Sequence, residues 1–146
     1  MLRNRGHSMW LPYHELGHRP MYSSSNSLLS VDPEFIEKVG PLLLQNKVNL
    51  VLFGHVHNYE RTCSVYQNKC MAMPKRDGNR IDTYDHSNYS APLHAVIGMA
   101  GFSLDKFPND VESWSLSRIS QFGYFKGHAT KKELKLSVCK FRYNES

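Results

Sequence analysis

The chain has 146 residues, of which 40% are hydrophobic and 21% are charged, and its net charge is +5. This balance is typical of a globular domain and excludes collagen-like, low-complexity and disordered chains. The basic residues are scattered rather than gathered in one stripe, which argues against a nucleic-acid partner.

The sequence also argues against a membrane partner. The longest uninterrupted apolar stretch, Leu50 to Phe53, is too short to cross a bilayer. Near the N-terminus, Pro12, His14 and Glu15 interrupt the segment that would form the apolar centre of a signal peptide. We therefore expect no transmembrane helix and no signal peptide in this chain.

The first predicted element is a helix that begins after a polar loop at residues 23–27. Asp32 is a good N-cap residue, and Pro33 suits the first helical position. Gly40 and Pro41 should kink or break the helix. Its core-facing residues recur at helical spacing, namely Phe35, Ile36, Val39, Leu42 and Leu43.

A buried strand is predicted at residues 48–53, which are almost continuously apolar. Gly54 ends it. A helix followed by a buried strand is half of an α/β unit, and ligands of open α/β sheets bind beyond the carboxyl ends of the strands. His55 and His57 stand at that place in the sequence.

The remainder of the chain divides into four predicted segments. Residues 58–92 are polar and are predicted to form a long surface excursion. A second strand is predicted at residues 93–100, and a loop at residues 103–120. Residues 122–130 and 133–141 alternate in polarity around a Lys-Lys turn, which predicts an antiparallel hairpin covering one edge of the sheet.

The cysteines and the N-glycosylation tripeptides indicate the cellular compartment in which the protein folds. Cys63 and Cys70 enclose a short polar loop, so a disulfide between them is expected in an oxidising compartment, with Cys139 left over. Asn88 and Asn144 each begin an N-glycosylation tripeptide. These features favour secretion, whereas the missing signal peptide points the other way.

Three of the eight histidines have informative positions. His55 and His57 follow the buried strand with one residue between them, and His18 stands in another turn opened by a glycine. Neutral imidazole is a common ligand of zinc and iron. The competing interpretation is that one of the pair is buried and hydrogen-bonded while the other is simply exposed.

The residues after His57 allow three interpretations. Tyr59, Glu60 and Arg61 can orient metal-binding histidines from outside the ligand set, or Glu60 and Arg61 can form a purely structural ion pair. In a third interpretation, His18, His55 and His57 complete a mononuclear zinc site with Glu60 as the base.

Several runs of sequence together resemble a known family. They are Gly17 to Tyr22, Val48 to Phe53, Gly54 to Arg61, Ala91 to Gly98 and Phe122 to Tyr124. The chain resembles the C-terminal half of the catalytic domain of a plant-type purple acid phosphatase, in the calcineurin-like metallophosphoesterase superfamily. The resemblance implies an α/β (α+β) fold, the C-terminal half of a β-sandwich flanked by helices.

The resemblance also implies a division of the chain and a chemistry. Residues 1–16 are atypical of the family, residues 17–90 correspond to the catalytic domain, and residues 91–146 correspond to its C-terminal cap. Family members are secreted and hydrolyse phosphate monoesters with iron and a divalent zinc, manganese or iron ion. By resemblance, His18 and His55 bind the divalent ion, and His57 binds the ferric ion. Tyr59, Glu60 and Arg61 support them.

Departures from the family pattern bear on activity. The motifs Asp-x-Gly, Gly-Asp-x-x-Tyr and Gly-Asn-His do not occur in this sequence, so the resemblance implies that four of seven metal ligands are missing. Residues 25–28 replace histidines that bind substrate in active members, as in members regarded as inactive. We therefore assign no catalytic residue and expect no activity from the chain alone. The alternative is a non-catalytic binding or regulatory module, and homo-oligomerisation is compatible with either.

Overall fold

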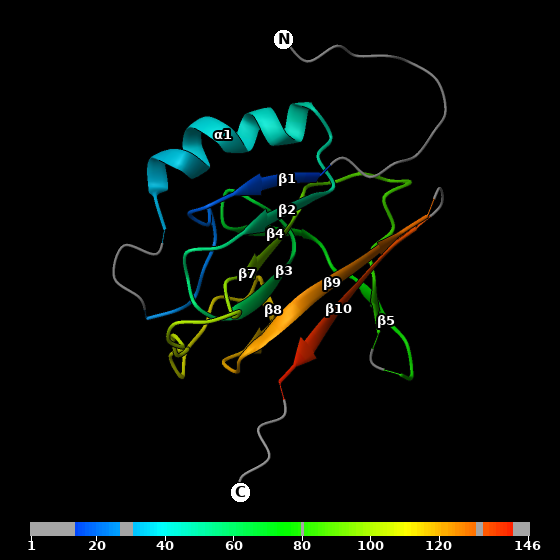
Figure 1. Ribbon diagram of the computed structural model, residues 1–146. Coiled ribbons are helices and arrows are strands. Elements are labelled where there is room, and N and C mark those ends of the chain that lie inside the picture. The colour runs from blue at the N-terminus through cyan, green and yellow to red at the C-terminus, as the bar shows by residue number, and fades with distance from the viewer. Residues whose placement is uncertain (1–13, 27–30, 80, 131–132, 142–146) are drawn as a thin grey trace, which may run out of the picture.

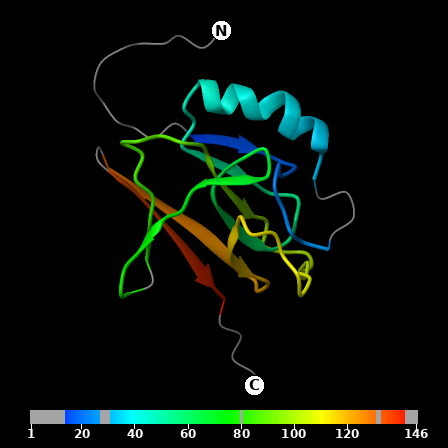
Figure 2. The same ribbon diagram turned by 180° about the vertical axis from the view of Figure 1, so that it is seen from behind.

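A computed structural model describes residues 14–26, 31–79, 81–130 and 133–141. Over these residues the chain has a mixed α/β fold with one helix and mostly strands, which confirms the predicted fold class (Figure 1). The helix lies beside β1 and β2 in opposite views (Figures 1 and 2). No helix in the described part of the chain is long and apolar enough to cross a membrane.

The helix α1 spans Pro33–Gln45 and begins as predicted. The carboxylate of Asp32 accepts a hydrogen bond from the Glu34 backbone N–H at 3.0 Å, and Pro33 occupies the first turn. The expected break at Pro41 does not occur. The apolar stripe continues past Pro41 to the buried Leu43, so core packing compensates for the hydrogen bond that proline cannot donate.

Six strands form the main sheet, in the order β1-β2-β7-β3-β4 with β8 paired to β3. The strand β1 (His14–Gly17) pairs in parallel with β2 (Leu50–Phe53), which pairs in parallel with β7 (Leu93–Ile97). The predicted strands at 48–53 and 93–100 are thereby confirmed. Gly17 lies opposite Phe53, and Phe53 opposite Val96, so the three parallel strands end at the same level.

Two predictions of irregular structure were wrong. Within residues 58–92, Tyr59–Tyr66 forms the eight-residue strand β3, flanked in the sheet by β7, β8 and β4 (Lys69–Ala72). Within residues 103–120, Ser115–Ile119 forms β8. Polar side chains such as Glu60 are buried in β3 with hydrogen-bond partners, and the pairing shifts register after Arg61, so the strand lacks an alternating pattern.

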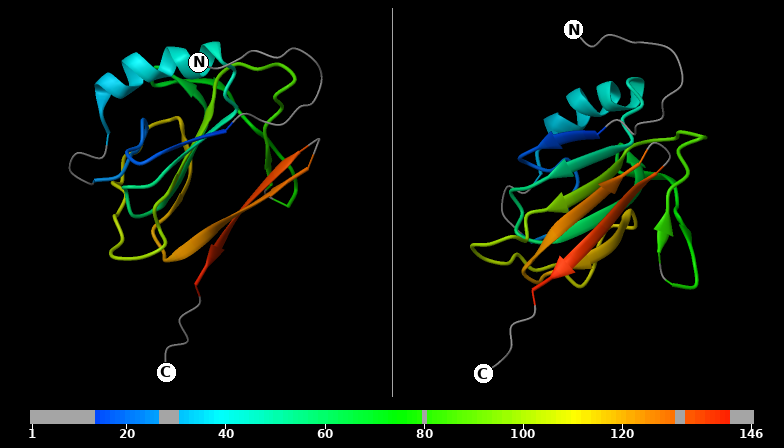
Figure 3. Two further views of the ribbon diagram at one scale, coloured as in Figure 1. Left: turned by 45° about the horizontal axis from the view of Figure 1, so that its top comes forward. Right: turned by 45° about the vertical axis from the view of Figure 1, so that its right-hand side comes forward.

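The C-terminal hairpin consists of β9 (Gly123–Ala129) and β10 (Leu134–Lys140), which pair antiparallel as predicted. It does not extend the edge of the main sheet but forms a separate two-stranded sheet. Figure 3 shows this hairpin on the side of the main sheet away from α1. The ring of Phe125 stacks against Tyr59 of β3 at 6.4 Å, so the contact is between faces of the two sheets.

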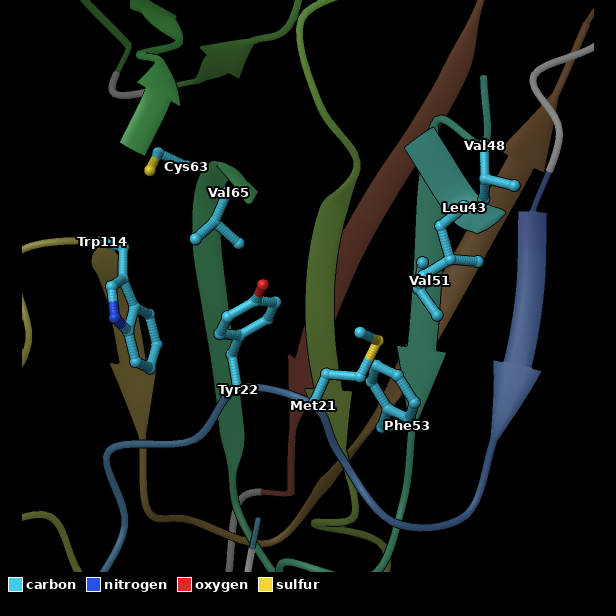
Figure 4. Close-up of a cluster of buried hydrophobic side chains, with 9 residues drawn as sticks. All are labelled: Met21, Tyr22, Leu43, Val48, Val51, Phe53, Cys63, Val65 and Trp114. Atoms are coloured by element: carbon cyan, nitrogen blue, oxygen red, sulfur yellow. The ribbon is translucent and has the colours of Figure 1, made fainter. Parts of the chain in front are cut away.

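The main hydrophobic core lies between α1 and the sheet. Figure 4 shows the loop after β1 contributing Met21 and Tyr22 to it. The ring of Tyr22 contacts that of Trp114 at 5.6 Å, which joins the loop to the segment before β8. The buried residues of this cluster are Met21, Tyr22, Leu43, Val48, Val51, Phe53, Cys63, Val65 and Trp114.

A disulfide joins Cys63 in β3 to Cys70 in β4, and Cys139 is free. Cys63 is fully buried, whereas Cys70 is exposed. Of the two sequons, Asn88 lies in an exposed turn, and Asn144 falls outside the described residues.

An ion-pair cluster around the Asp82 carboxylate fastens a short hairpin to β3. The hairpin consists of β5 (Lys75–Arg76) and β6 (Asp82–Thr83). The Asp82 carboxylate accepts hydrogen bonds from Arg76 at 2.6 and 2.8 Å and from Arg61 at 2.5 Å. These bonds, that of Arg76 first, lower the pKa of Asp82 from 3.8 to about 2.

We predict that Asp82→Asn lowers the free energy of unfolding by about 1–2 kcal/mol at neutral pH. Because the folded-state pKa is depressed, the contribution of Asp82 is complete above about pH 4 and disappears as the pH falls towards 2. Urea unfolding at several pH values measures it, with the exposed Asp110→Asn as the matched control. Equal stability of both variants at pH 7 would contradict the prediction.

Candidate functional site

Three turns meet where the parallel strands end. His18 follows β1, His55 follows β2, and Gly98 follows β7. They line an open pocket of about 750 Å³. Its other lining residues are Gly54, His57, Gly101, Ser103 and Asp105.

The pocket brings the predicted ligands His18 and His55 together. The Nε2 atom of His18 lies 3.1 Å from the Nδ1 atom of His55, and the ring centroids are 4.9 Å apart. The Gly54 N–H donates to the backbone carbonyls of Gly17 and His18 at 3.3 and 3.1 Å, which ties the two turns to each other. His55 itself has a left-handed backbone, with φ of 63°.

The environment favours the neutral form of His55. Burial lowers its pKa, and electrostatic interactions with His18, Arg19 and His57 lower it further, opposed by Asp105. An imidazole binds a metal ion only through a nitrogen that carries no proton. The lowered pKa therefore keeps His55 in the metal-binding form to a lower pH.

His57 is held by a different set of contacts. Its backbone N–H donates to the Asp105 carboxylate at 2.8 Å, and its carbonyl accepts from the Asp105 N–H at 3.0 Å. Its Nδ1 atom lies 3.1 Å from the Ser103 hydroxyl. His57 thus lines the same pocket but does not share the contact between His18 and His55.

The distance between the ring nitrogens of His18 and His55, which contact each other directly, matches the spacing of two ligands on one metal ion. Two nitrogens on a tetrahedral zinc ion at 2.0–2.1 Å are about 3.3 Å apart, close to the observed 3.1 Å. Within the described residues, however, no three or more His, Cys, Asp or Glu side chains are grouped to hold a metal ion. The described chain therefore brings two potential ligands together, fewer than a closed site needs.

The residues predicted to support the histidines lie away from the pocket lining. Tyr59 stacks on Phe125 of the hairpin. Arg61 donates to Asp82 and lies over the ring of Tyr84 at 5.5 Å. An ion pair between Glu60 and Arg61 is not formed; Arg61 pairs with Asp82 instead.

Glu60 is almost completely buried, with 1% of its surface exposed. Its carboxylate accepts hydrogen bonds from the Ser24 N–H at 2.9 Å, from the Ser24 hydroxyl and from the Ser115 hydroxyl. These bonds hold the loop that follows His18 against β3 and β8. Glu60 therefore acts on the position of that loop, and it does not line the histidine pocket.

Known proteins match this chain in sequence and in fold. The family described as iron/zinc purple acid phosphatase-like protein C matches residues 91–141. The structure of purple acid phosphatase PPD1 from yellow lupin seeds is 31% identical, with a TM-score of 0.71 over 88% of this chain and 23% of that one. This chain is related to the purple acid phosphatases and matches their C-terminal part. The resemblance seen in the sequence is confirmed.

The relatives include proteins named as inactive. The Arabidopsis thaliana protein "Probable inactive purple acid phosphatase 24" is 36% identical in an alignment of 122 residues that covers 80% of this chain and 18% of that protein. The barley (Hordeum vulgare) "Nucleotide pyrophosphatase/phosphodiesterase" is 32% identical in an alignment of 128 residues that covers 84% of this chain and 32% of that protein. The chain thus spans a third or less of the length of these relatives.

Sequence reasoning missed three residues that line or shape the pocket. Ser103 and Asp105 lie in the segment predicted to be an ordinary loop. A Cβ atom on Gly98 would lie 2.1 Å from the Val56 carbonyl oxygen, so only glycine allows this approach. Gly98 falls inside the strand predicted at residues 93–100, whereas the observed strand ends at Ile97; Gly98 and Gly101, close together at this strand end, were the available signal.

Gly98→Ala should destabilise the chain by about 1–3 kcal/mol, because the turn between His55 and His57 must move away from the new methyl group. Gly101→Ala is the matched control, since it lines the same pocket and a Cβ there meets nothing within 4 Å. Thermal unfolding followed by circular dichroism compares the two variants. A Gly98→Ala variant as stable as Gly101→Ala would show that the close approach is wrong.

Proposed function

We propose that this chain forms one side of the metal site of a metal-dependent phosphomonoesterase, with His18 and His55 holding a divalent ion. The 3.1 Å approach of their ring nitrogens at the end of two parallel strands is the observation that carries this proposal. The purple acid phosphatases, to which the chain is related, generally use metals.

The remaining metal assignments follow the family. We propose zinc, manganese or iron for the divalent site and iron for the site of His57. Since Nδ1 of His57 faces the Ser103 hydroxyl, Nε2 is the nitrogen left for a metal ion. When bound, the two ions would activate a water molecule and stabilise the charge on a phosphate monoester.

The residues around the histidines hold them in position, and we assign none of them a role in proton transfer. Asp105 fixes the backbone of His57 through two hydrogen bonds, and Glu60 fixes the loop after His18. The family's Asp-x-Gly, Gly-Asp-x-x-Tyr and Gly-Asn-His motifs do not occur in this sequence. We therefore propose that this chain alone does not hydrolyse phosphate monoesters.

We further propose a secretory compartment. The disulfide between Cys63 and Cys70 supports it. Cys70 lies on the surface, so cytosolic reductants would reach this bond, whereas an oxidising compartment would preserve it. The exposed Asn88 sequon is also consistent with it. That the chain binds no nucleic acid or membrane and can form homo-oligomers stays a prediction.

A non-catalytic binding or regulatory module is the second candidate. It is favoured by the absence of a group of three potential metal ligands among the described residues. Both candidates predict no turnover by this chain. They differ in metal binding, which the first requires and the second does not.

Zinc titration of the folded chain by calorimetry tests the proposal. We expect one zinc ion per chain, and His18→Ala or His55→Ala should each weaken binding at least about tenfold, because each removes one of two converging ligands. The affinity should fall on acidification because protons compete for the imidazoles, and the lowered pKa of His55 should place its loss at a lower pH than that of a free histidine.

The control is His128→Ala, which removes an exposed histidine of β9. It should bind zinc like the unchanged chain. If His18→Ala and His55→Ala also bind zinc like the unchanged chain, the metal proposal fails and the binding module is favoured. Release of phosphate from p-nitrophenyl phosphate by the zinc-loaded chain would contradict the proposed lack of activity.

A further inference from the structure

Phe102 stands between two residues of the pocket lining, in an unfavourable environment. It exposes 96% of its surface and is therefore not part of the hydrophobic core. Its φ of 67° lies in the left-handed region, which bulky residues rarely adopt because of steric strain. Both the exposed apolar surface and the left-handed backbone of Phe102 are unfavourable for folding. Phe102 stands between Gly101 and Ser103, which both line the pocket.

The backbone segment that carries Phe102 is nevertheless held in place. The centroid of the Phe102 ring lies 5.5 Å from that of His57, with the rings nearly perpendicular. The segment that carries it is fastened to His57 by the Ser103 hydroxyl and by both hydrogen bonds of Asp105. Ser120 adds a hydrogen bond from its hydroxyl to the Asp105 carbonyl at 2.8 Å. The ring therefore stands beside the pocket, in contact with His57, with nearly all of its surface in solvent.

The residues that line the pocket lack an apolar contact surface for a ligand, which the Phe102 ring can provide. Histidines, glycines, Ser103 and Asp105 line the pocket, and none of them offers an aliphatic or phenyl surface. They suit a metal ion and an anionic phosphate group. Phe102 stands between two residues of this lining and exposes a large apolar side chain, so it suits the part of a ligand that is not phosphate.

We propose that Phe102 determines specificity, and that its ring takes a planar aromatic group of a phosphate ester whose phosphate lies at His18 and His55. This inference rests on the proposed function, since it needs the metal-loaded pocket to bind phosphate. Aromatic rings pack against each other in offset or edge-to-face arrangements, which a ring with one free side permits. The ester group would thus be recognised outside the metal-binding histidines.

The test compares two probes on the zinc-loaded chain by calorimetry, 1-naphthyl phosphate and glycerol phosphate. Both carry the same phosphate group, and only the first has an aromatic ring. We expect the unchanged chain to bind naphthyl phosphate at least about fivefold more tightly. Phe102→Ala should abolish this preference without changing the affinity for glycerol phosphate, and Phe102→Trp should retain it.

Ile81→Ala is the control, because it removes another exposed apolar side chain far along the sequence from the pocket lining. It should keep the preference, and thermal unfolding checks that all variants fold. If glycerol phosphate binds but Phe102→Ala leaves the naphthyl preference intact, the inference fails and the proposed function stands. If neither probe binds the zinc-loaded chain, the inference fails together with phosphate binding at this pocket.

Discussion

The parallel register of β1, β2 and β7 is the constraint on which the site depends. Because these strands end at one level, the turns that follow them meet at one edge of the sheet. The hydrogen bonds of Gly54 to the turn after β1 then draw His18 and His55 together. On the other side, the missing side chain of Gly98 lets the β7 turn approach the Val56 carbonyl.

Buried polar groups hold the surroundings of this edge in place. Glu60 and Asp82 both have almost no exposed side-chain surface, and each is surrounded by donors. Burying a carboxylate is costly unless donors replace its water, so each of these groups selects one arrangement of its neighbours. Glu60 selects the position of Ser24 and of β8, and Asp82 selects that of the β5–β6 hairpin.

Local signals in the sequence predicted the elements that depend on local chemistry. The cap at Asp32, the apolar run of β2 and the alternation in β10 were sufficient for the helix, a strand and the hairpin. The strand β3 was missed because its polar residues are stabilised by distant partners such as Ser24 and Ser115. The convergence of His18 with His55 followed from a resemblance, whereas Phe102 is distinguished only by its exposure and backbone angle.

The central claim is that His18 and His55 bind one metal ion together. Zinc K-edge X-ray absorption of the zinc-loaded chain tests it most directly, because imidazole ligands give a characteristic multiple-scattering pattern. The account predicts at least two imidazoles per zinc ion, at about 2.0–2.1 Å, and one fewer in His55→Ala. A spectrum without imidazole, or one that His55→Ala leaves unchanged, would contradict it.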